Sequence, residues 1–489
     1  MSTVNGGTGA QVGLSFLAAG SRLCIGLTRP APGGGALQTH DGDTIVAPAT
    51  APGSAGVAVL RLSGRAAVTI AAALSGTPAA GLEHGFMRFV RLRDGSGATL
   101  DRGYVVVFRK PRSFTGEDVA ELQVHGSPAV VARLMDAAVS LGARPAQPGE
   151  FSQRAFRNGR MDLVQAEALA DLIAARSESA RTLALSHLDG DLSQLLVELR
   201  DPMVAALAEV EARLDFDTEQ DVAGLDRSGA AAMLAALADR MAALAGTARA
   251  GRVRLHGVRV VLVGAPNAGK STLFNALVGS DRAIVHAEPG TTRDLIEVTG
   301  ELAGVGITWI DSAGLREGAD EVEADGVRRT QLALASADVV VWLADGSVTQ
   351  PQFAAPEVPN LFAVRTKSDL PDHPWWRRHP RFATALAVSS TRGLGLEQLR
   401  AALAELIAGL GDEQTLGATM VLARDRQAAG LQRAAEACRR GVLALAQDMP
   451  LELAAADLRD AIDALAEVTG EIAPDDVLAA IFSRFCIGK

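Results

Sequence analysis

The sequence has few cysteines, and they lie far apart. Cys24, Cys438 and Cys486 form no C-x-x-C pair. This number and spacing exclude a disulfide framework and argue against a structural zinc site. The composition fits a reducing compartment, and we expect the protein in the cytoplasm.

Long apolar runs and a net positive charge are also absent. No apolar run approaches the length that a membrane-spanning helix needs. The formal net charge is −10 at pH 7, so the whole chain has no attraction for nucleic acid or for an anionic membrane. Any RNA partner must therefore be held by a local basic patch.

The chain has 489 residues and is 48% hydrophobic, which predicts two to four domains. Residues 1–42 are rich in Gly, Ala, Ser and Thr and are expected to be a disordered extension. A signal or organelle-targeting peptide is the competing interpretation, although Gly20, Ser21 and Arg22 interrupt the apolar part.

Residues 43–155 are expected to form a compact α+β domain. Short β-like runs at Val57–Leu62 and Gly103–Phe108 alternate with Gly and Pro turns, and the apolar pattern of Ala129–Leu141 is typical of a helix.

Helical patterns dominate residues 156–256 and 411–489. Leucines and other apolar residues recur every three or four positions, as one buried face of a helix requires. Pro202 is compatible with a kink or with the first turn of a new helix. We therefore expect one all-α helical domain, divided by the inserted segment 257–410.

The inserted segment contains a phosphate-binding motif. Arg259–Val263 is a β-branched run typical of a buried strand, and Ser271–Val278 continues as a helix. Between them, residues 264–271 read G-A-P-N-A-G-K-S and match G-x-x-x-x-G-K-[ST]. Backbone N–H groups of such a loop converge on phosphate oxygens, the lysine neutralises them, and the Ser271 hydroxyl can bind Mg²⁺. The alternative is a Gly-rich turn that binds nothing.

Further motifs follow in the order that a GTPase needs. Asp311 ends an apolar strand and can reach the Mg²⁺ shell, and Gly314 can offer its N–H to the γ-phosphate. Asp369 can accept both N–H groups of the guanine edge, which selects GTP over ATP. The segment 389–391 can form the last turn against the base, and Thr292 is a candidate switch ligand to Mg²⁺. Each segment alone could be an ordinary strand end or polar turn.

These features, read together, predict an inserted α/β P-loop domain of the Ras-like type, a G domain. The expected nucleotide contacts are Asn267, Ala268, Gly269, Lys270, Ser271, Thr272, His286, Ala287, Glu288, Pro289, Gly290, Thr291, Thr292, Asp311, Ser312, Ala313, Gly314, Thr366, Lys367, Ser368, Asp369, Ser389, Ser390 and Thr391.

The chain resembles the MnmE (TrmE) family of tRNA modification GTPases from Asp43 to Lys489. The matching stretches are 43–45 (D-T-I), 113–122 (S-F-T-G-E-D-V-A-E-L), 148–151 (P-G-E-F), 154–156 (R-A-F), 162–167 (D-L-V-Q-A-E), 311–316 (D-S-A-G-L-R) and 485–489 (F-C-I-G-K). The resemblance implies an N-terminal domain that dimerises and binds a one-carbon folate, and an FAD-dependent partner, MnmG, in a heterotetramer. Together such proteins add an aminomethyl or carboxymethylaminomethyl group to C5 of the wobble uridine of certain tRNAs.

The resemblance also assigns a folate site. Carried over to this sequence, the site would be Arg61, Glu121, Arg160 and Lys489. A pterin offers a donor edge to a carboxylate, and cations suit the glutamate of folate. The cofactor would be 5,10-methylenetetrahydrofolate, with 5-formyltetrahydrofolate as a bound form. Thr366 stands where the family usually has the asparagine of N-K-x-D.

Catalysis is implied in the same way. Glu323 would act on the attacking water, although its acidic stretch could equally be a solvated charge run. Ser271 and Thr292 would ligate Mg²⁺. A potassium ion would be held by the set Asn267, His286, Glu288 and Thr291. The alternative for Asn267 is that it only tolerates an unusual backbone angle.

Two functions remain open at this point. One is a GTPase that drives tRNA modification, and the other is a P-loop GTPase switch in ribosome assembly or signalling.

Overall fold

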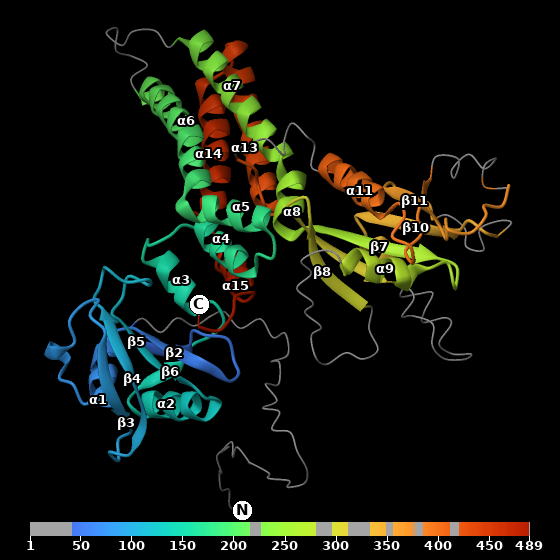
Figure 1. The fold of residues 1–489 in the computed structure, drawn as a ribbon. Helices are drawn as coiled ribbons and strands as arrows, with labels where there is room; N and C mark the ends of the chain where they lie inside the picture. The colour runs from blue at the N-terminus through green and yellow to red at the C-terminus, as the bar shows by residue number, and fades with distance from the viewer. Residues whose placement is uncertain are drawn as a thin grey trace, which may run out of the picture. The chain divides into compact units, whose positions relative to one another are not determined.

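The computed structural model describes residues 42–215, 226–279, 296–311, 333–348, 356–374, 376, 385–410 and 420–488. Within these residues the chain forms an N-terminal α+β domain, a helical domain and a P-loop G domain, as expected (Figure 1). The predictions made for residues 1–41 lie outside the described residues.

The N-terminal domain is built on one six-stranded sheet. Its strands are β1 (Thr44–Pro48), β2 (Ala55–Ser63), β3 (Arg88–Arg93), β4 (Thr99–Phe108), β5 (Val119–Gly126) and β6 (Ala143–Pro145). Their order is β3-β4-β5-β2-β1-β6, with β1 and β6 parallel and the other pairs antiparallel. The two strands expected from the sequence lie inside β2 and β4, which confirms them.

The two faces of this sheet are covered differently. Helices α1 (Ala67–Ser75) and α2 (Pro128–Ser140) and the turn η1 (Ala79–Gly81) belong to one side, where α1 and α2 enclose a core that includes Leu60, Leu92 and Leu122. Helix α3 (Glu150–Arg157) contributes Phe151 to a smaller cluster with Ile45 and Ala47 of β1.

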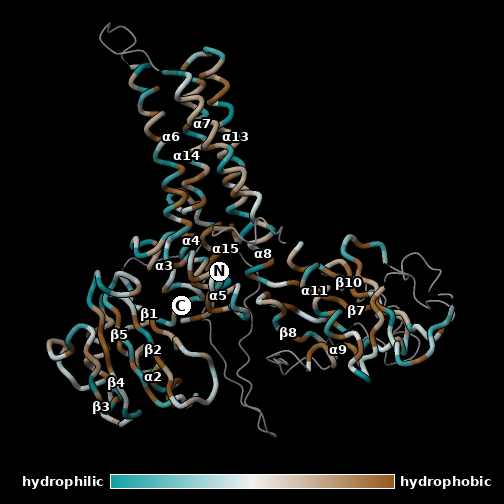
Figure 2. The backbone as a smooth tube through the Cα atoms, turned by 45° about the horizontal axis from the view of Figure 1, so that its top comes forward, coloured by the Kyte–Doolittle hydropathy of each residue, from teal (hydrophilic) through white to brown (hydrophobic). Residues whose placement is uncertain are grey.

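The helical domain draws its core from both sides of the insertion. Its helices are α4 (Leu163–Ala174), α5 (Glu178–Asp189), α6 (Asp191–Asp215), α7 (Arg227–Gly246), α8 (Ala248–His256), α13 (Asp425–Ala446), α14 (Leu451–Thr469) and α15 (Asp475–Phe482). One cluster of buried residues joins α6 and α7 to α13 and α14, which confirms a single divided bundle. The long helices alternate between hydrophilic and hydrophobic colour, as helices with one buried face do (Figure 2). Pro202 lies inside the continuous helix α6.

One helical stretch among the described residues, Arg227–His256, is long and apolar enough to pass a membrane-span test by length and composition. It consists of α7 and α8. Leu234 and Met241 of α7 are fully buried in the core of the bundle, and this packing accounts for the apolar character of the helix.

The G domain contains the second six-stranded sheet, in the order β12-β11-β10-β7-β9-β8. Its elements are β7 (Val258–Gly264), α9 (Lys270–Val278), β8 (Ile296–Leu302), β9 (Val305–Asp311), β10 (Val339–Asp345), β11 (Leu361–Thr366), β12 (Leu386–Ala387) and α11 (Leu396–Leu410). All pairings are parallel except that of β8 with β9. The predicted strands, Arg259–Val263 and the apolar run that ends at Asp311, lie in β7 and β9, which confirms them, and β8 was not foreseen. Parallel order brings the carboxyl ends of β7, β9, β10 and β11 to one edge, where the candidate nucleotide residues lie.

Candidate functional site

The phosphate-binding loop joins β7 to α9. Gly264 has a φ of 159°, and a Cβ atom there would lie 2.5 Å from the carbonyl oxygen of Leu343, so only glycine fits beside β10. Gly269 is the N-cap of α9 with a φ of 87°. The N-terminus of α9 therefore points its backbone N–H groups at the loop, where a phosphate would bind.

Lys270 is buried at the first position of α9. Its Nζ atom donates to the carbonyl oxygens of Gly264 and Ala265 at 3.0 and 2.9 Å. The loop itself thus supplies acceptors that hold the ammonium group where phosphate oxygens would bind. Ser271 and Thr272 are exposed beside it.

Ser271 meets the end of β9. Its hydroxyl donates to Oδ2 of Asp311 at 2.8 Å, and the Asp311 side chain is buried. A hydroxyl and a carboxylate together are the oxygen ligands that Mg²⁺ prefers, directly or through water. These two residues fit a magnesium site, although they lie 40 positions apart in the sequence.

Thr366 faces the phosphate-binding loop. The residue is buried, and its hydroxyl lies 2.7 Å from the carbonyl oxygen of Ala268 and 3.1 Å from that of Ala344. A single hydroxyl proton serves these two acceptors, and the shorter contact favours Ala268. Thr366 therefore ties the end of β11 to the phosphate loop.

Asp369 stands at the other end of this site with an exposed side chain. A hydrogen bond from the Ser389 side chain lowers its pKa, and its own backbone N–H, Arg392 and Lys367 act in the same direction. Asp369 is thus held as an anion that can accept from a base edge. The backbone N–H of Ser368 donates to the carbonyl oxygen of Val388 at 3.2 Å, which brings the segment 389–391 alongside.

Lys367 has a partner that the sequence did not suggest. It adopts a left-handed φ of 58°, and its Nζ atom lies 2.6 Å from Oδ2 of Asp345 at the end of β10. Burial alone would raise the pKa of Asp345, but hydrogen bonds from Lys367 and Ser347 outweigh it and lower the pKa. An acid at the carboxyl end of a fully buried strand is the signal that could have identified this residue.

Asn267 has a φ of 61° and an exposed side chain. Asparagine adopts this left-handed conformation more readily than most residues, so the backbone alone gives a reason for its presence. The loop 286–292, Ser312 to Gly314, Glu323 and Lys489 lie outside the described residues, and the predictions made for them are untested by the structure.

In the N-terminal domain, Arg61 and Glu121 face each other across β2 and β5. The Arg61 Nε atom lies 2.9 Å from Oε1 of Glu121, and both side chains are largely buried. The Arg61 guanidinium lies 5.4 Å from the ring centre of Phe114 and 5.9 Å from that of Phe151. A carboxylate, a cation and two aromatic rings therefore lie together on this side of the sheet. These groups suit a pterin.

Two further segments adjoin this pair. The exposed Arg160 packs against Gly116, since a Cβ atom at Gly116 would lie 3.3 Å from its Cγ atom. Residues 486–488 contact the end of β1 and the segment before α3. The carbonyl oxygen of Cys486 accepts from the N–H of Gly149 at 3.4 Å, and a Cβ atom at Gly488 would lie 2.0 Å from the carbonyl oxygen of Pro48. Because Ala47 pairs with Arg61, this tail approaches the same region.

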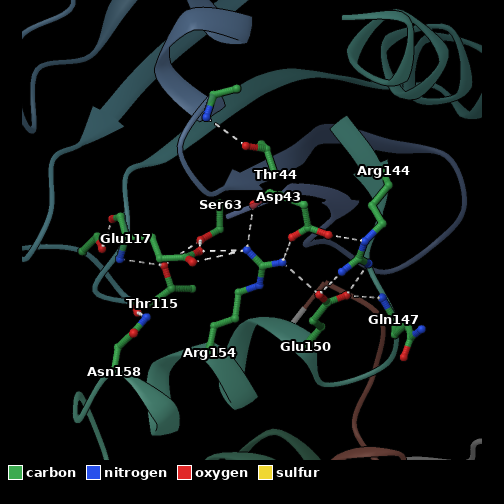
Figure 3. A network of polar contacts seen from close by, with 12 residues as sticks. Asp43, Thr44, Ser63, Thr115, Glu117, Arg144, Gln147, Glu150, Arg154 and Asn158 are labelled. Atoms are coloured by element: carbon green, nitrogen blue, oxygen red, sulfur yellow. Dashed lines mark hydrogen bonds and ion pairs between the residues drawn. The ribbon is translucent and has the colours of Figure 1, made fainter. Parts of the chain in front are cut away.

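A network of ion pairs connects α3 to β1 and to neighbouring loops of this domain (Figure 3). Arg154 of α3 donates to Asp43, Glu117 and Glu150, with distances of 2.5, 3.1 and 3.0 Å. Arg144 donates to Asp43 and Glu150 at 2.6 Å each. Sequence reasoning noted most of these residues only for their resemblance and gave them no role. The network fixes α3 against β1 and against the loop that carries Phe114.

The network holds Asp43 and Glu150 in the charged form. Burial alone would raise the pKa values of Asp43 and Glu150. Hydrogen bonds from the two arginines outweigh burial and lower both values, while the pKa of Arg154 rises. Each carboxylate of the network has an arginine partner, so the network serves as a structural element.

Comparison with known proteins agrees with this architecture. A family profile described as the GTP-binding protein TrmE N-terminus matches residues 44–160, and one described as the MnmE helical domain matches residues 163–486. The tRNA modification GTPase MnmE of Alkalilimnicola ehrlichii is 44% identical over 91% of this chain and 99% of its own length. The MnmE of Phenylobacterium zucineum is 43% identical over 91% of this chain and 100% of its own length.

Among solved structures, the G domain of the T. maritima FeoB iron transporter is 25% identical and covers 32% of this chain and 99% of its own. Its TM-score of 0.22 is too low to add to the argument. The two family profiles and the near-complete overlap with the relatives are sufficient: the chain belongs to the MnmE (TrmE) family of tRNA modification GTPases.

Proposed function

We propose that this protein is a cytoplasmic, potassium-dependent GTPase that modifies C5 of the wobble uridine of certain tRNAs. It acts as a homodimer with an FAD-dependent partner of the MnmG type, in a heterotetramer. The added group is aminomethyl or carboxymethylaminomethyl, and a one-carbon tetrahydrofolate supplies the carbon.

Each polar group of the G-domain site has a role in GTP hydrolysis. The N–H groups at the start of α9 bind phosphate oxygens, and the Lys270 ammonium exchanges its two loop carbonyls for them. Ser271 and Thr292 would hold Mg²⁺, and Asp311 would support the same ion. A bound Mg²⁺ neutralises charge that develops on the phosphates. Asp369 accepts from the guanine edge, and Glu323 orients or deprotonates the attacking water.

Potassium completes the site in this proposal. The Asn267 side-chain oxygen and backbone carbonyls of the 286–291 loop would hold the cation, which would offset the charge that develops on the phosphates. We expect turnover to rise steeply when K⁺ replaces Na⁺ at fixed ionic strength, and Asn267→Ala to remove that response.

The left-handed backbone of Asn267 requires a matched variant, because alanine is strained at a φ of 61°. Asn267→Gly removes the side-chain oxygen and keeps the backbone conformation. If Asn267 is a ligand, both variants lose the response to K⁺. A glycine variant that still responds to K⁺ would show that only the backbone angle matters, and equal rates in both salts for the unaltered protein would refute the potassium mechanism.

The folate site rests on the N-terminal sheet. Arg61, Glu121 and Arg160 would hold the folate together with Lys489. Arg61 occupies Oε1 of Glu121, and Oε2 has no hydrogen-bond partner among the described residues, so it can accept from a pterin. We expect Arg160→Ala to weaken folate binding in calorimetry while GTP affinity stays the same.

One observation carries the modification function over a simple switch. The tail at residues 486–488 packs against the end of β1, near the Arg61–Glu121 pair, and this arrangement supports a second, non-nucleotide site. A ribosome-assembly or signalling switch, the alternative, needs only the G domain.

Mass spectrometry of wobble nucleosides tests the proposal. In a strain that lacks this protein, C5-modified uridines should disappear, and the unaltered gene should restore them. A plasmid carrying Glu323→Ala should restore few or none. Persistence of these nucleosides in the deletion strain would leave the switch as the better interpretation.

A further inference from the structure

One end of the N-terminal sheet face is open to solvent. Strand β3 is the edge of the sheet (Figure 1). Its Val90 and Leu92 are buried in the same core as residues of α1 and α2. Alternation along the strand therefore places Phe89, Arg91 and Arg93 on the opposite face, where all three are exposed.

The neighbouring strand continues the same face. Phe89 pairs with Tyr104 and Arg91 pairs with Arg102 across β3 and β4. The two rings form an edge-to-face pair with centroids 5.3 Å apart, yet Phe89 is 63% exposed and Tyr104 is 44% exposed. On the next strand, Gln123 pairs with Tyr104. We call these six residues, Phe89, Arg91, Arg93, Arg102, Tyr104 and Gln123, the aromatic–arginine face.

The stability of the sheet does not account for this composition. Like charges directly opposite each other on neighbouring strands are destabilising, and Arg91 faces Arg102 in this way. Neither these two arginines nor Arg93 has an ion pair within the part of the chain that the structure describes. The acids next to Arg93 and Arg102 in the sequence form other pairs, Asp94 with Arg133 and Asp101 with His125. The positive charge is therefore left for an external anion.

Exposed aromatic rings beside unpaired arginines on an open sheet match the chemistry of single-stranded RNA. Bases stack on rings, guanidinium groups bind phosphates, and a side-chain amide can read a base edge. A hollow of about 400 Å³ adjoins the face and is lined by Phe86, Met87 and Phe89, with Arg88 and Glu83 at its wall. Its size is sufficient for a nucleobase.

A second copy of the chain fits this face less well. Two copies meeting on it would bring three arginines of each chain together, and none of the six residues of the face is an acid that could compensate them. The chain as a whole carries a charge of −10, so this patch is a local exception of the kind that RNA binding by an acidic protein requires.

The position of the face relates it to the folate residues. Gln123 and Glu121 lie two residues apart on β5, roughly 7 Å, and point to the same side. A nucleotide held on Phe89 and Tyr104 would thus lie on the same surface as the Arg61–Glu121 pair.

We propose that the aromatic–arginine face binds unpaired nucleotides of the tRNA anticodon loop. The inference rests on the proposed tRNA function and assigns it a surface.

Fluorescence anisotropy of the full chain with a labelled RNA hairpin that carries the anticodon loop tests the assignment. A blunt duplex of the stem sequence is the RNA control. The unaltered protein should bind the hairpin more tightly than the duplex. Phe89→Ala with Tyr104→Ala should weaken hairpin binding about 10-fold or more. Arg91→Ala with Arg102→Ala should weaken it and reduce the slope of log Kd against log salt by about 1.4.

A matched variant controls for charge. Arg181→Ala with Arg433→Ala also removes two exposed arginines, but these are paired with Glu178 and Glu467, and binding should hardly change. Thermal unfolding of each variant checks that it is folded. Phe89→Leu with Tyr104→Phe, which keeps a ring at the second position, should recover part of the affinity lost in the alanine pair.

The outcomes separate the surface from the function. If the unaltered protein binds the hairpin and both face variants bind it equally well, the face is not the RNA-binding surface. The proposed tRNA function would be unaffected by that result. No hairpin binding by the unaltered protein at low salt would refute both. Light scattering covers the remaining case: if the face variants dissociate an oligomer while RNA affinity stays unchanged, the face is an interface between copies.

Discussion

The polar network of the N-terminal domain and the nucleotide site of the G domain differ in the source of their partners. In the network, Arg154 and Arg144 satisfy Asp43, Glu117 and Glu150 from within the protein. In the G domain, Lys270 is held by loop carbonyls and Asp369 points to solvent. A network that completes itself contributes to stability, whereas groups held by replaceable partners are available to a ligand.

Removal of Arg154 should have the largest effect. Arg154→Ala removes one arginine partner from the buried Glu150 and from the partly buried Asp43, at a cost of about 3–5 kcal/mol in the free energy of unfolding of the N-terminal domain. Far-UV circular dichroism in urea measures this loss. All four tryptophans lie at positions 309–376, in the G domain, so their fluorescence transition should stay in place. If the circular dichroism transition and the tryptophan transition shifted together, the stabilising role of the network would not be specific to the N-terminal domain.

Arg459→Ala is the matched control for this variant. Arg459 forms a surface pair with Glu211 and is 56% exposed, so its loss should cost at most about 1 kcal/mol.

Asp369 should show the opposite behaviour, with a change in ligand preference at constant stability. Asp369→Asn presents an amide donor where the carboxylate accepted, so preference should move from GTP toward xanthosine triphosphate by about 100-fold. Competition binding with both nucleotides measures the shift. Unchanged selectivity for GTP would count against the assigned role, and a shifted tryptophan unfolding transition would count against the contrast with Arg154.

Thr366 shares features of both regions. It is buried and hydrogen-bonded within the protein, yet it belongs to the nucleotide site. Thr366→Val removes the hydroxyl that holds Ala268 and keeps the shape, so GTP affinity should fall about 10-fold. Thr366→Ser retains the hydroxyl and is the control. Equal nucleotide affinity in both variants would show that the contact with the phosphate loop has no role in binding.

Lowering the pH should reduce the contribution of the network to stability, because the pKa values of two of its acids are lowered in the folded protein. Asp43 and Glu150 have folded pKa values below their ordinary values of 3.8 and 4.5. Their contribution to stability is therefore complete above those ordinary values and is lost as the pH falls through the lowered folded values. Urea unfolding of the N-terminal domain between neutral pH and pH 3 should show a loss smaller than that caused by Arg154→Ala. In the Arg154→Ala variant this dependence on pH should weaken, and an unchanged dependence would contradict the explanation.

The G-domain strands could be predicted because β-branched runs such as Arg259–Val263 are buried on both faces and leave a continuous apolar signal. Strand β3, with three arginines among six residues, gave no such signal. The nucleotide motifs could be found because each is short and local. The partners of Arg154 and Thr366 could not, since Asp43 lies 111 positions from Arg154 and Ala268 lies 98 positions from Thr366. Only the folded chain brings such residues together.

The divided helical domain also sets an order of folding during synthesis. Helices α6 and α7 are translated before the G domain, but they share their core with α13 and α14, which are translated after it. At the junction the chain closes tightly: a Cβ atom at Gly251 of α8 would lie 1.7 Å from the carbonyl oxygen of Leu422. On the ribosome, the G domain can therefore complete its own core before α13 and α14 are made. During that time the apolar faces of α6 and α7 are not yet covered. A nascent chain stalled once the whole G domain has emerged from the ribosome should bind GTP and expose these two helices to chaperones.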